Sequence, residues 1–272
     1  GLGKLASIGN QMDVRHQDVV QYLADDPDTD VIGLFVEGIK DGSGFLSAIK
    51  KASRIKPIVI LKGGRTDAGS RAAVSHTGSL AGDFRVAKAA FAQAGALVAE
   101  TTEDFLDYLF ALAYNRHQLP KDEKLAIVTI SGGPCVAASD YCEEIGLKVP
   151  ELGEGTREKL REYIPYFAAD SNPVDMTVGI PLENIGPCVD TVMSDPDISG
   201  IIAINWGWDV KEFADAFVDG SKKHKKPVLA FASENPTVQD IFRRGGVINF
   251  PAPERAVKAY WGLLQYGKVI DK

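Results

Sequence analysis

The sequence lacks the marks of several protein classes. No apolar run approaches the ~18 to 20 residues of a membrane-spanning helix, and the first residues do not have the charged and apolar regions of a signal peptide. Its three cysteines are an odd number without metal-ligand spacing, which argues against a disulfide framework. Basic residues form no stripe, and the formal net charge is -7. We therefore expect a cytoplasmic protein with no metal site and no membrane or nucleic-acid partner.

What the sequence does contain is a recurring pattern of strand and helix. Short apolar runs rich in β-branched residues are each followed by a stretch with helical spacing. Continuous apolar strands between amphipathic helices indicate a parallel sheet with helices on both faces, the doubly wound α/β class. The predicted strands are residues 5–8, 31–36, 58–61, 125–130, 200–204 and 228–231.

The length of 272 residues predicts two domains. An apolar helix at residues 105–114 is followed by a polar, proline-containing segment before a new strand, which is typical of a boundary. We therefore place the first domain at residues 1–118 and the second at 119–272. The first holds roughly three strands and has no βα unit before its opening strand, so it is either small or begins inside a larger domain.

The segment after the strand at 58–61 has the composition of a phosphate-handling loop. Residues 62–82 contain five glycines, two arginines, five serines or threonines and one histidine. Small residues let backbone N–H groups approach an anion, and hydroxyls and guanidinium groups add donors. A Walker A loop is excluded because Ser70 and Arg71 stand where that motif requires lysine and a hydroxyl residue.

His76 is the candidate nucleophile of this segment. Ser75, Thr77 and Gly78 flank it as candidate phosphate-binding residues, and an amphipathic helix is expected to start near Asp83. An imidazole can accept a phosphoryl group, and a helix N-terminus can stabilise the resulting dianion. A loop histidine that bonds only to backbone groups fits the same residues, so these residues alone do not distinguish a nucleophile from a structural histidine.

Glu37 is the candidate partner of this histidine. It directly follows the strand at 31–36, at the sheet edge where the His76 segment also begins. A carboxylate there can hold the far ring nitrogen, so that the correct tautomer faces the substrate. An ordinary solvated charge at a strand end has the same appearance.

The strand at 125–130 leads into a second candidate phosphate site at Ser131, Gly132 and Gly133. Proline after two glycines at a helix start leaves N–H groups free to bind an anion, although a plain tight βα turn has the same sequence. Further on, Trp206 and Trp208 follow a strand end, where they either line a pocket or simply pack.

Together these segments resemble the phosphohistidine core of the NDP-forming acyl-CoA synthetases, relatives of succinyl-CoA synthetase. The resemblance covers nearly the whole chain, and its segments fall in family order. They are residues 7–14, 25–29, 35–39, 62–82, 131–134 and 171–175.

The resemblance implies two flavodoxin-like, succinyl-CoA-ligase-like domains. It implies that His76 is phosphorylated, that Glu37 orients its ring, and that the turn at residues 131–133 faces it as a phosphate cradle. The implied reaction is reversible: phosphate opens an acyl-CoA thioester to an acyl phosphate, His76 takes the phosphoryl group, and ADP or GDP receives it. CoA, ADP/ATP or GDP/GTP and Mg²⁺ would serve the complete enzyme, and none is expected to bind tightly to this chain alone.

The resemblance also implies partners. The family normally carries a CoA-binding Rossmann domain and an ATP-grasp domain, in the same chain or another subunit, and neither is recognisable here. We therefore expect a portion of a larger homo- or hetero-oligomeric enzyme, with its acyl substrate undetermined. Cys135 departs from the family, in which many members have glycine at this position.

Two other functional classes compete with the ligase. One is a ligase-like regulatory or ligand-sensing region fused to a protein acetyltransferase, and the other is a pair of flavodoxin-like scaffold domains without a covalent step. The presence of both His76 and Glu37 favours the ligase.

Overall fold

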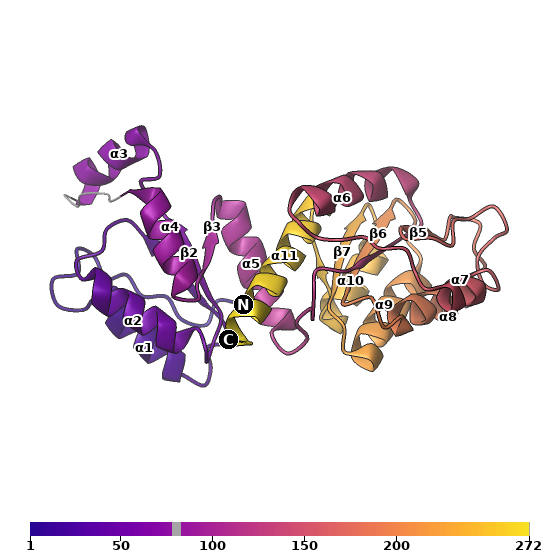
Figure 1. The fold of residues 1–272 in the computed structure, drawn as a ribbon, viewed down its shortest axis with the longest axis horizontal. Coiled ribbons are helices and arrows are strands. Elements are labelled where there is room, and N and C mark those ends of the chain that lie inside the picture. The colour runs from indigo at the N-terminus through magenta and orange to yellow at the C-terminus, as the bar shows by residue number, and fades with distance from the viewer. Residues whose placement is uncertain (78–82, 272) are drawn as a thin grey trace. The chain divides into compact units, whose positions relative to one another are not determined.

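Two parallel sheets, each covered by helices, form the chain (Figure 1). The computed structural model describes residues 1–77 and 83–271, and within 73–77 it describes the backbone only. By compactness the chain divides into two units, residues 1–113 together with those from 265 onward, and residues 114–264. The fold class is as predicted, and the domain limits of 1–118 and 119–272 stay a prediction.

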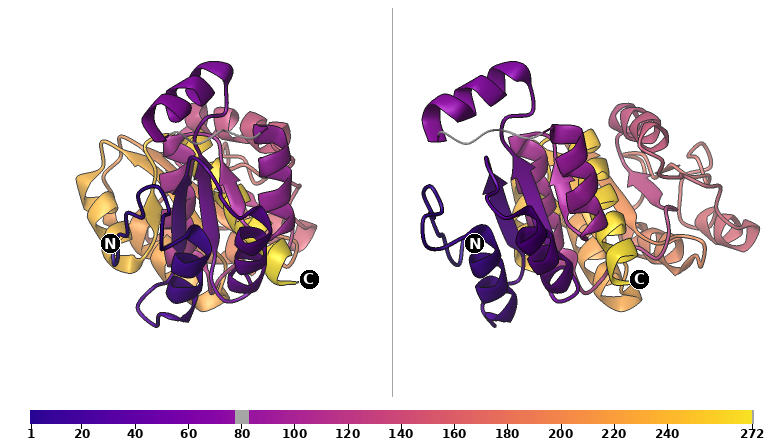
Figure 2. Two further views of the ribbon diagram at one scale, coloured as in Figure 1. Left: turned by 90° about the vertical axis from the view of Figure 1, so that its left-hand side faces the viewer. Right: turned by 60° about the vertical axis from the view of Figure 1, so that its left-hand side comes forward.

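The first unit has a three-stranded parallel sheet in the order β1-β2-β3 (Figure 2). Alternation along β1 places Ile32, Leu34 and Val36 in a core with helices α1, α2 and α4. On the opposite face, the Cβ position of Gly33 lies 2.9 Å from a ring atom of Phe105 in α5. The bounds are β1 (Ile32–Val36), β2 (Ile58–Lys62), β3 (Leu97–Ala99), α1 (His16–Asp25), α2 (Gly42–Ala52), α3 (Asp67–Thr77), α4 (Phe84–Gln93) and α5 (Thr102–Asn115).

Two expectations for this unit were wrong. Residues 5–8 form no strand, and Leu5 is 86% exposed. A strand requires a neighbour that supplies ladder hydrogen bonds, and in the described part of the chain the sheet begins at β1, whose partner is β2. Residues 62–82 are not a continuous loop, because residues 67–77 form helix α3. Alanines favour this helix, and Thr66 Oγ1 accepts the N–H of Gly69 at 3.1 Å.

The second unit has five parallel strands in the order β5-β4-β6-β7-β8. Numbered from its first strand, this is the order 2-1-3-4-5 of flavodoxin-like folds, whose ligand crevice lies where the order reverses. Here the reversal falls between β4 and β6. The bounds are β4 (Ala126–Thr129), β5 (Val174–Asp175), β6 (Ile201–Trp206), β7 (Val228–Ser233), β8 (Ile248–Asn249), α6 (Gly132–Glu144), α7 (Glu154–Leu160), α8 (Leu182–Ser194), α9 (Lys211–His224), α10 (Pro236–Gly245) and α11 (Pro253–Ile270).

Helices cover both faces of this second sheet. On one face, helices α7 to α10 bury a core that includes Phe213, Phe217 and Phe242. On the other, Tyr260 of α11 is fully buried beside Gly200, the residue that precedes β6. Among the described residues, no helix has the length and apolar character needed to cross a membrane. No group of three or more His, Cys, Asp and Glu side chains there could hold a metal ion.

Gly200 is predicted to be intolerant of any side chain. A Cβ at this position would lie 2.5 Å from a ring carbon of Tyr260 and 2.9 Å from Pro227. Gly200→Ala should therefore lower the free energy of unfolding by about 1–3 kcal/mol in denaturant titrations. The control Gly155→Ala adds its Cβ to open space in helix α7 and should be stabilising by up to about 1 kcal/mol. Equal effects of the two substitutions would contradict the close packing at Gly200.

The first unit should lose stability as the pH falls below about 6.5. His16 is 8% exposed and packs on Phe45 with a ring-centroid distance of 5.3 Å, and its buried Nδ1 has no hydrogen-bond partner in the described part of the chain. Burial lowers the pKa of His16, so the unfolded chain binds the proton more tightly and protonation favours unfolding.

His16→Gln should flatten the dependence of the unfolding midpoint on pH between about 7.5 and 5.5, the range around the histidine pKa. The exposed histidine variant His117→Gln should leave the dependence as it is. A pH dependence that survives in His16→Gln would exclude His16 as its source.

Candidate functional site

Glu37 lies at the carboxyl edge of the first sheet, where β1 and β2 are tied together. The Lys62 ammonium donates to the backbone oxygen of Glu37 at 2.6 Å and also to that of Gly63. Gly63 N–H donates to Val36 O at 2.9 Å, and the Glu37 Cγ lies 3.4 Å from the Cβ position that Gly63 leaves empty. A side chain at residue 63 would therefore contact the Glu37 side chain.

Lys62 is 4% exposed, which is rare for a lysine. Burial lowers the pKa of its ammonium, and the Glu37 carboxylate acts in the opposite direction. Gln11 supports the same turn from the N-terminal segment: its Nε2 donates to Gly38 O at 3.0 Å, and its backbone oxygen accepts from the Lys40 ammonium at 3.2 Å. These contacts hold the backbone on both sides of the Glu37 side chain.

His76 follows this edge through helix α3. Gly64, with φ of 71°, permits the turn out of β2, and α3 then carries Ser75, His76 and Thr77 in its last turn. Only the backbone of these three residues is described, and Gly78 lies outside the described residues. The contact between the His76 ring and Glu37, and the phosphate-binding roles of Ser75, Thr77 and Gly78, therefore stay predictions.

The helix expected near Asp83 is confirmed as α4, which begins at Phe84. The Asp83 carboxylate caps it by accepting the N–H groups of Arg85 at 2.7 Å and Val86 at 3.3 Å. On the other side of α3, the guanidinium of Arg65 donates to Glu100 O and lies 5.5 Å from the centre of the Phe84 ring. The two ends of the His76 segment are therefore anchored to the first unit.

In the second unit, Ser131, Gly132 and Gly133 lie at the point where the strand order reverses. Thr129 is fully buried, and its hydroxyl accepts the Ser131 N–H at 2.8 Å and donates to Ser131 O at 2.9 Å. The Ser131 hydroxyl bonds in turn to the backbone N and O of Trp206, at 3.0 and 3.3 Å. This hydroxyl therefore joins β4 to β6 and does not cap the start of α6.

Gly132 and Gly133 are exposed, and their N–H groups begin α6. The first N–H groups of a helix have no partner within it, and the helix dipole is positive there. An uncapped start is therefore competent to bind an anion. Whether a phosphate occupies it in the reaction stays a prediction.

Cys135 and Asp175 lie beside this turn. The thiol donates to Gly132 O at 2.8 Å within a regular helix, so cysteine does not distort the start of α6. Burial, and to a smaller degree the Asp175 carboxylate, raises the pKa of this thiol. Asp175 Oδ2 lies 3.3 Å from the Cβ position of Gly132, while its Oδ1 accepts the N–H of Thr177 at 2.9 Å.

The two tryptophans after β6 differ in their surroundings. Asn205 is fully buried; its Nδ2 donates to Trp208 O at 2.8 Å, and its Oδ1 accepts the Trp208 N–H at 3.3 Å. The Trp208 side chain packs on the core. Trp206 instead is 60% exposed. The packing interpretation therefore holds for Trp208 alone.

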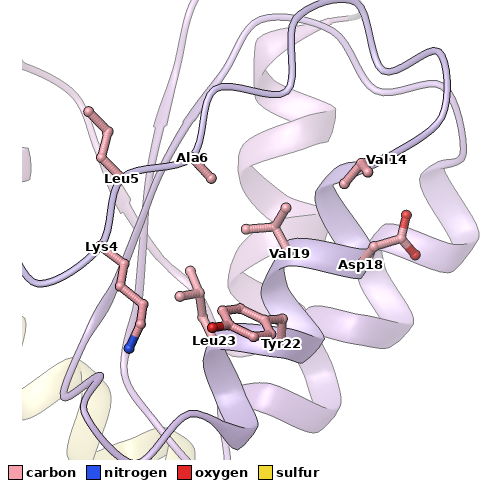
Figure 3. Close-up of a pocket in the computed structure, with 8 residues that line it drawn as sticks. All are labelled: Lys4, Leu5, Ala6, Val14, Asp18, Val19, Tyr22 and Leu23. Atoms are coloured by element: carbon pink, nitrogen blue, oxygen red, sulfur yellow. The ribbon is translucent and has the colours of Figure 1, made fainter.

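A groove of about 390 Å³ lies elsewhere in the first unit, between the N-terminal segment and α1 (Figure 3). Leu5, Val19 and Leu23 supply much of its apolar wall, and Lys4 is held at one end by Asp26 at 2.6 Å. Among the described site residues, neither Glu37 nor the turn at residues 131–133 lines this groove.

Sequence reasoning missed two residues that position the site, Lys62 and Thr129. Both are the last residue of an otherwise apolar strand, and both are turned inward to bond the backbone of the next turn. A polar residue at such a position was the available signal.

Comparisons with known proteins agree with this architecture. Residues 1–112 match the family model of the succinyl-CoA ligase like flavodoxin domain, and residues 125–241 match that of the ligase-CoA domain. The alpha subunit of acetate–CoA ligase (ADP-forming) II from Pyrococcus furiosus is 37% identical, over 98% of this chain and 60% of its own length. Acetate–CoA ligase (ADP-forming) I from Archaeoglobus fulgidus is 33% identical, over the whole chain and 39% of its own length.

Among solved structures, the chain is similar to the dinucleotide-forming acetyl-coenzyme A synthetase 1 of Ca. Korarchaeum cryptofilum, in complex with phosphate and ADP. The TM-score is 0.88 at 30% identity, over 98% of this chain and 59% of that one. Fold and strand-end turns thus define a pair of succinyl-CoA-ligase-like flavodoxin domains. The chain belongs to the family of NDP-forming acyl-CoA synthetases, and it spans 60% or less of the length of these relatives.

Thr129→Val should destabilise the second unit without changing its shape. Valine matches threonine in size, but the buried bonds to the Ser131 backbone are lost, at a cost of about 1–3 kcal/mol. Thr191→Val is the matched control, because its hydroxyl bonds to a carbonyl one turn earlier in its own helix α8, at 2.8 Å. Equal midpoints for the two variants in urea denaturation would show that Thr129 does not hold the turn.

Proposed function

We propose that this chain is the phosphoryl-transfer core of an ADP- or GDP-forming acyl-CoA synthetase and that His76 carries the phosphoryl group. One observation carries the proposal: Glu37 is held at the carboxyl edge of the sheet from which the His76 segment departs. The family to which the chain belongs supports it, since the relatives above are named ADP-forming ligases. That naming also disfavours the acetyltransferase-fused regulatory alternative.

The proposed reaction has three reversible transfers. A phosphate oxygen attacks the thioester carbonyl of acyl-CoA, the C–S bond breaks, and CoA leaves as the thiol while an acyl phosphate forms. A ring nitrogen of His76 then attacks phosphorus, and the carboxylic acid leaves as its carboxylate. Finally, a terminal phosphate oxygen of ADP or GDP attacks the phosphohistidine, which yields the nucleoside triphosphate and restores His76.

Glu37 is the proposed orienting carboxylate. An imidazole nitrogen is nucleophilic only when its lone pair is free, so the proton must sit on the other ring nitrogen, where a carboxylate accepts it. The contacts from Lys62 and Gln11 support this role, because they fix the backbone around Glu37 before substrate arrives.

The groups proposed to donate hydrogen bonds to phosphate are Ser75, Thr77 and Gly78 beside His76, and the turn at residues 131–133. His76 lies in the last turn of α3, where the helix carbonyls disfavour a dianion. The phosphoryl group therefore needs donors from elsewhere. We therefore propose the start of α6, which the Ser131 side chain does not cap, as a second phosphate site of the reaction.

The whole reaction needs more protein than this chain. We propose that a CoA-binding Rossmann domain and an ATP-grasp domain with Mg²⁺ join it, in the same polypeptide or in another subunit of a cytoplasmic oligomer. The chain spans 60% of its Pyrococcus furiosus relative, which is named as a subunit. The acyl group would be donated by acyl-CoA or, in the reverse direction, by a free carboxylic acid.

The test is phosphoryl labelling of the intact protein together with its nucleotide- and CoA-binding parts. With acyl-CoA and labelled inorganic phosphate, we expect a base-stable, acid-labile label that ADP removes. His76→Asn should abolish this label. Glu37→Gln should slow its formation on the order of 10-fold or more, because the ring loses its acceptor.

His117→Asn, an exposed histidine variant, is the control and should label normally. A label that persists in His76→Asn, or no label on intact protein that binds both CoA and nucleotide, would rule out the proposed carrier. Binding of acyl-CoA without any label would instead point to the ligand-sensing class.

A further inference from the structure

Trp206 is exposed at the end of a strand whose other positions are buried. The five residues before it in β6 are buried, whereas Trp206 is 60% exposed. It lies where the strand order reverses between β4 and β6, the place where open parallel sheets bind ligands. A large apolar ring at such a place is a candidate ligand contact rather than a core residue.

The backbone that carries this ring is fixed before any ligand binds. The Ser131 hydroxyl bonds both backbone polar groups of Trp206, and the next residue, Gly207, donates to Ser233 O at 3.1 Å. The residue before Trp206, the fully buried Asn205, accepts a hydrogen bond at its Oδ1 from Asn235 Nδ2 at 3.2 Å. A rigid aromatic surface loses little entropy when a ligand packs on it, so it contributes efficiently to binding.

Strand alternation sets the direction of the ring. Ile201 and Ala203 belong to the core formed with α7 to α10, so even-numbered residues of β6, Trp206 among them, lie on the opposite face. Helix α6 packs on β4 and β6 and lies across the sheet from α8 and α9 (Figure 1). The indole therefore lies on the sheet face that α6 covers, and Ser131, which bonds the Trp206 backbone, is the residue before the start of that helix.

On its β5 side, the turn at residues 131–133 has a charged neighbour in place of an apolar one. In β5, the neighbour of β4 away from β6, Asp175 directs Oδ2 at the Cβ position of Gly132, 3.3 Å away. The turn at Ser131 and Gly132 is thus bonded to the backbone of Trp206 on its β6 side and lies close to a carboxylate on its β5 side. A second negative charge on the substrate would meet Asp175, whereas an apolar group can cover Trp206.

We propose that Trp206 is the surface on which the acyl group packs, and that it selects monocarboxylic acids with an aromatic or branched aliphatic group over acetate. The proposal rests on the proposed ligase function. An acyl phosphate has the matching form, with an anionic end for the start of α6 and an apolar body for the indole. Burial of that body against the ring favours larger acyl groups in proportion to their apolar area.

The test compares acids of different size in the intact synthetase, with kcat/KM measured for acetate, 3-methylbutanoate and phenylacetate. Trp206→Ala should lower kcat/KM for phenylacetate about 10- to 100-fold and that for acetate less than about 3-fold. Trp206→Phe keeps a flat ring and should retain most of the preference. In titrations with phenylacetate, the indole fluorescence of the wild type should change and that of Trp206→Phe should not.

Tyr22→Ala is the matched control, because Tyr22 is a 61% exposed aromatic residue on α1 of the first unit and its variant should match the wild type with all acids. An equal fall for all three acids, no change, or a gain for phenylacetate in Trp206→Ala would overturn the role of Trp206. Each of these results leaves wild-type turnover and the His76 label intact. Absence of turnover and of label in the wild type would overturn the ligase proposal and this one together.

Discussion

The parallel pairing of β4 with both β5 and β6 is the constraint on which the second unit depends. Parallel strands end at the same edge of a sheet, so Asp175, Ser131 and Trp206 come together although they are far apart in sequence. The Ser131 hydroxyl then bonds across from β4 to β6. Because the Ser131 hydroxyl bonds the backbone of Trp206, it does not cap α6. The bonds that join the two strands therefore also leave the helix start without a cap from Ser131.

In the first unit, a buried ammonium group joins the ends of two neighbouring strands. The Lys62 ammonium has carbonyl oxygens of Glu37 and Gly63 as acceptors, and these offset part of the cost of removing it from water. Its bonds hold the ends of two adjacent strands in one position. In both units, then, a polar side chain at the end of an apolar strand positions the turn that follows.

The sequence predicted the long elements of this fold better than its short strands and its local geometry. Five strands were found because four or more consecutive apolar residues mark a buried strand. Strands β3, β5 and β8 have two or three residues, too few to show any periodicity. Glycine and hydroxyl content suggested a loop at residues 62–82, whereas the alanines and the Thr66 cap make residues 67–77 a helix. Cys135 departs from the family at the α6 turn, yet the helix there is regular.

Contacts between distant strand ends explain what sequence reasoning left open. Trp206 and Trp208 are two residues apart and have the same side chain, yet one is exposed and the other packs on the core. The difference comes from Asn205, which turns the chain after β6 and bonds Trp208. No local pattern contains that information, because it depends on what β7 and α10 place nearby.

The division of the chain has a consequence for its synthesis. Residues from 265 onward belong to the first unit, and Val269 in α11 lies 3.0 Å from the Cβ position of Gly95. On the ribosome, the first unit therefore waits for its last contacts until the whole second unit has been translated. The N-terminal part of the chain, although it is made first, therefore completes its packing only when α11 has been made.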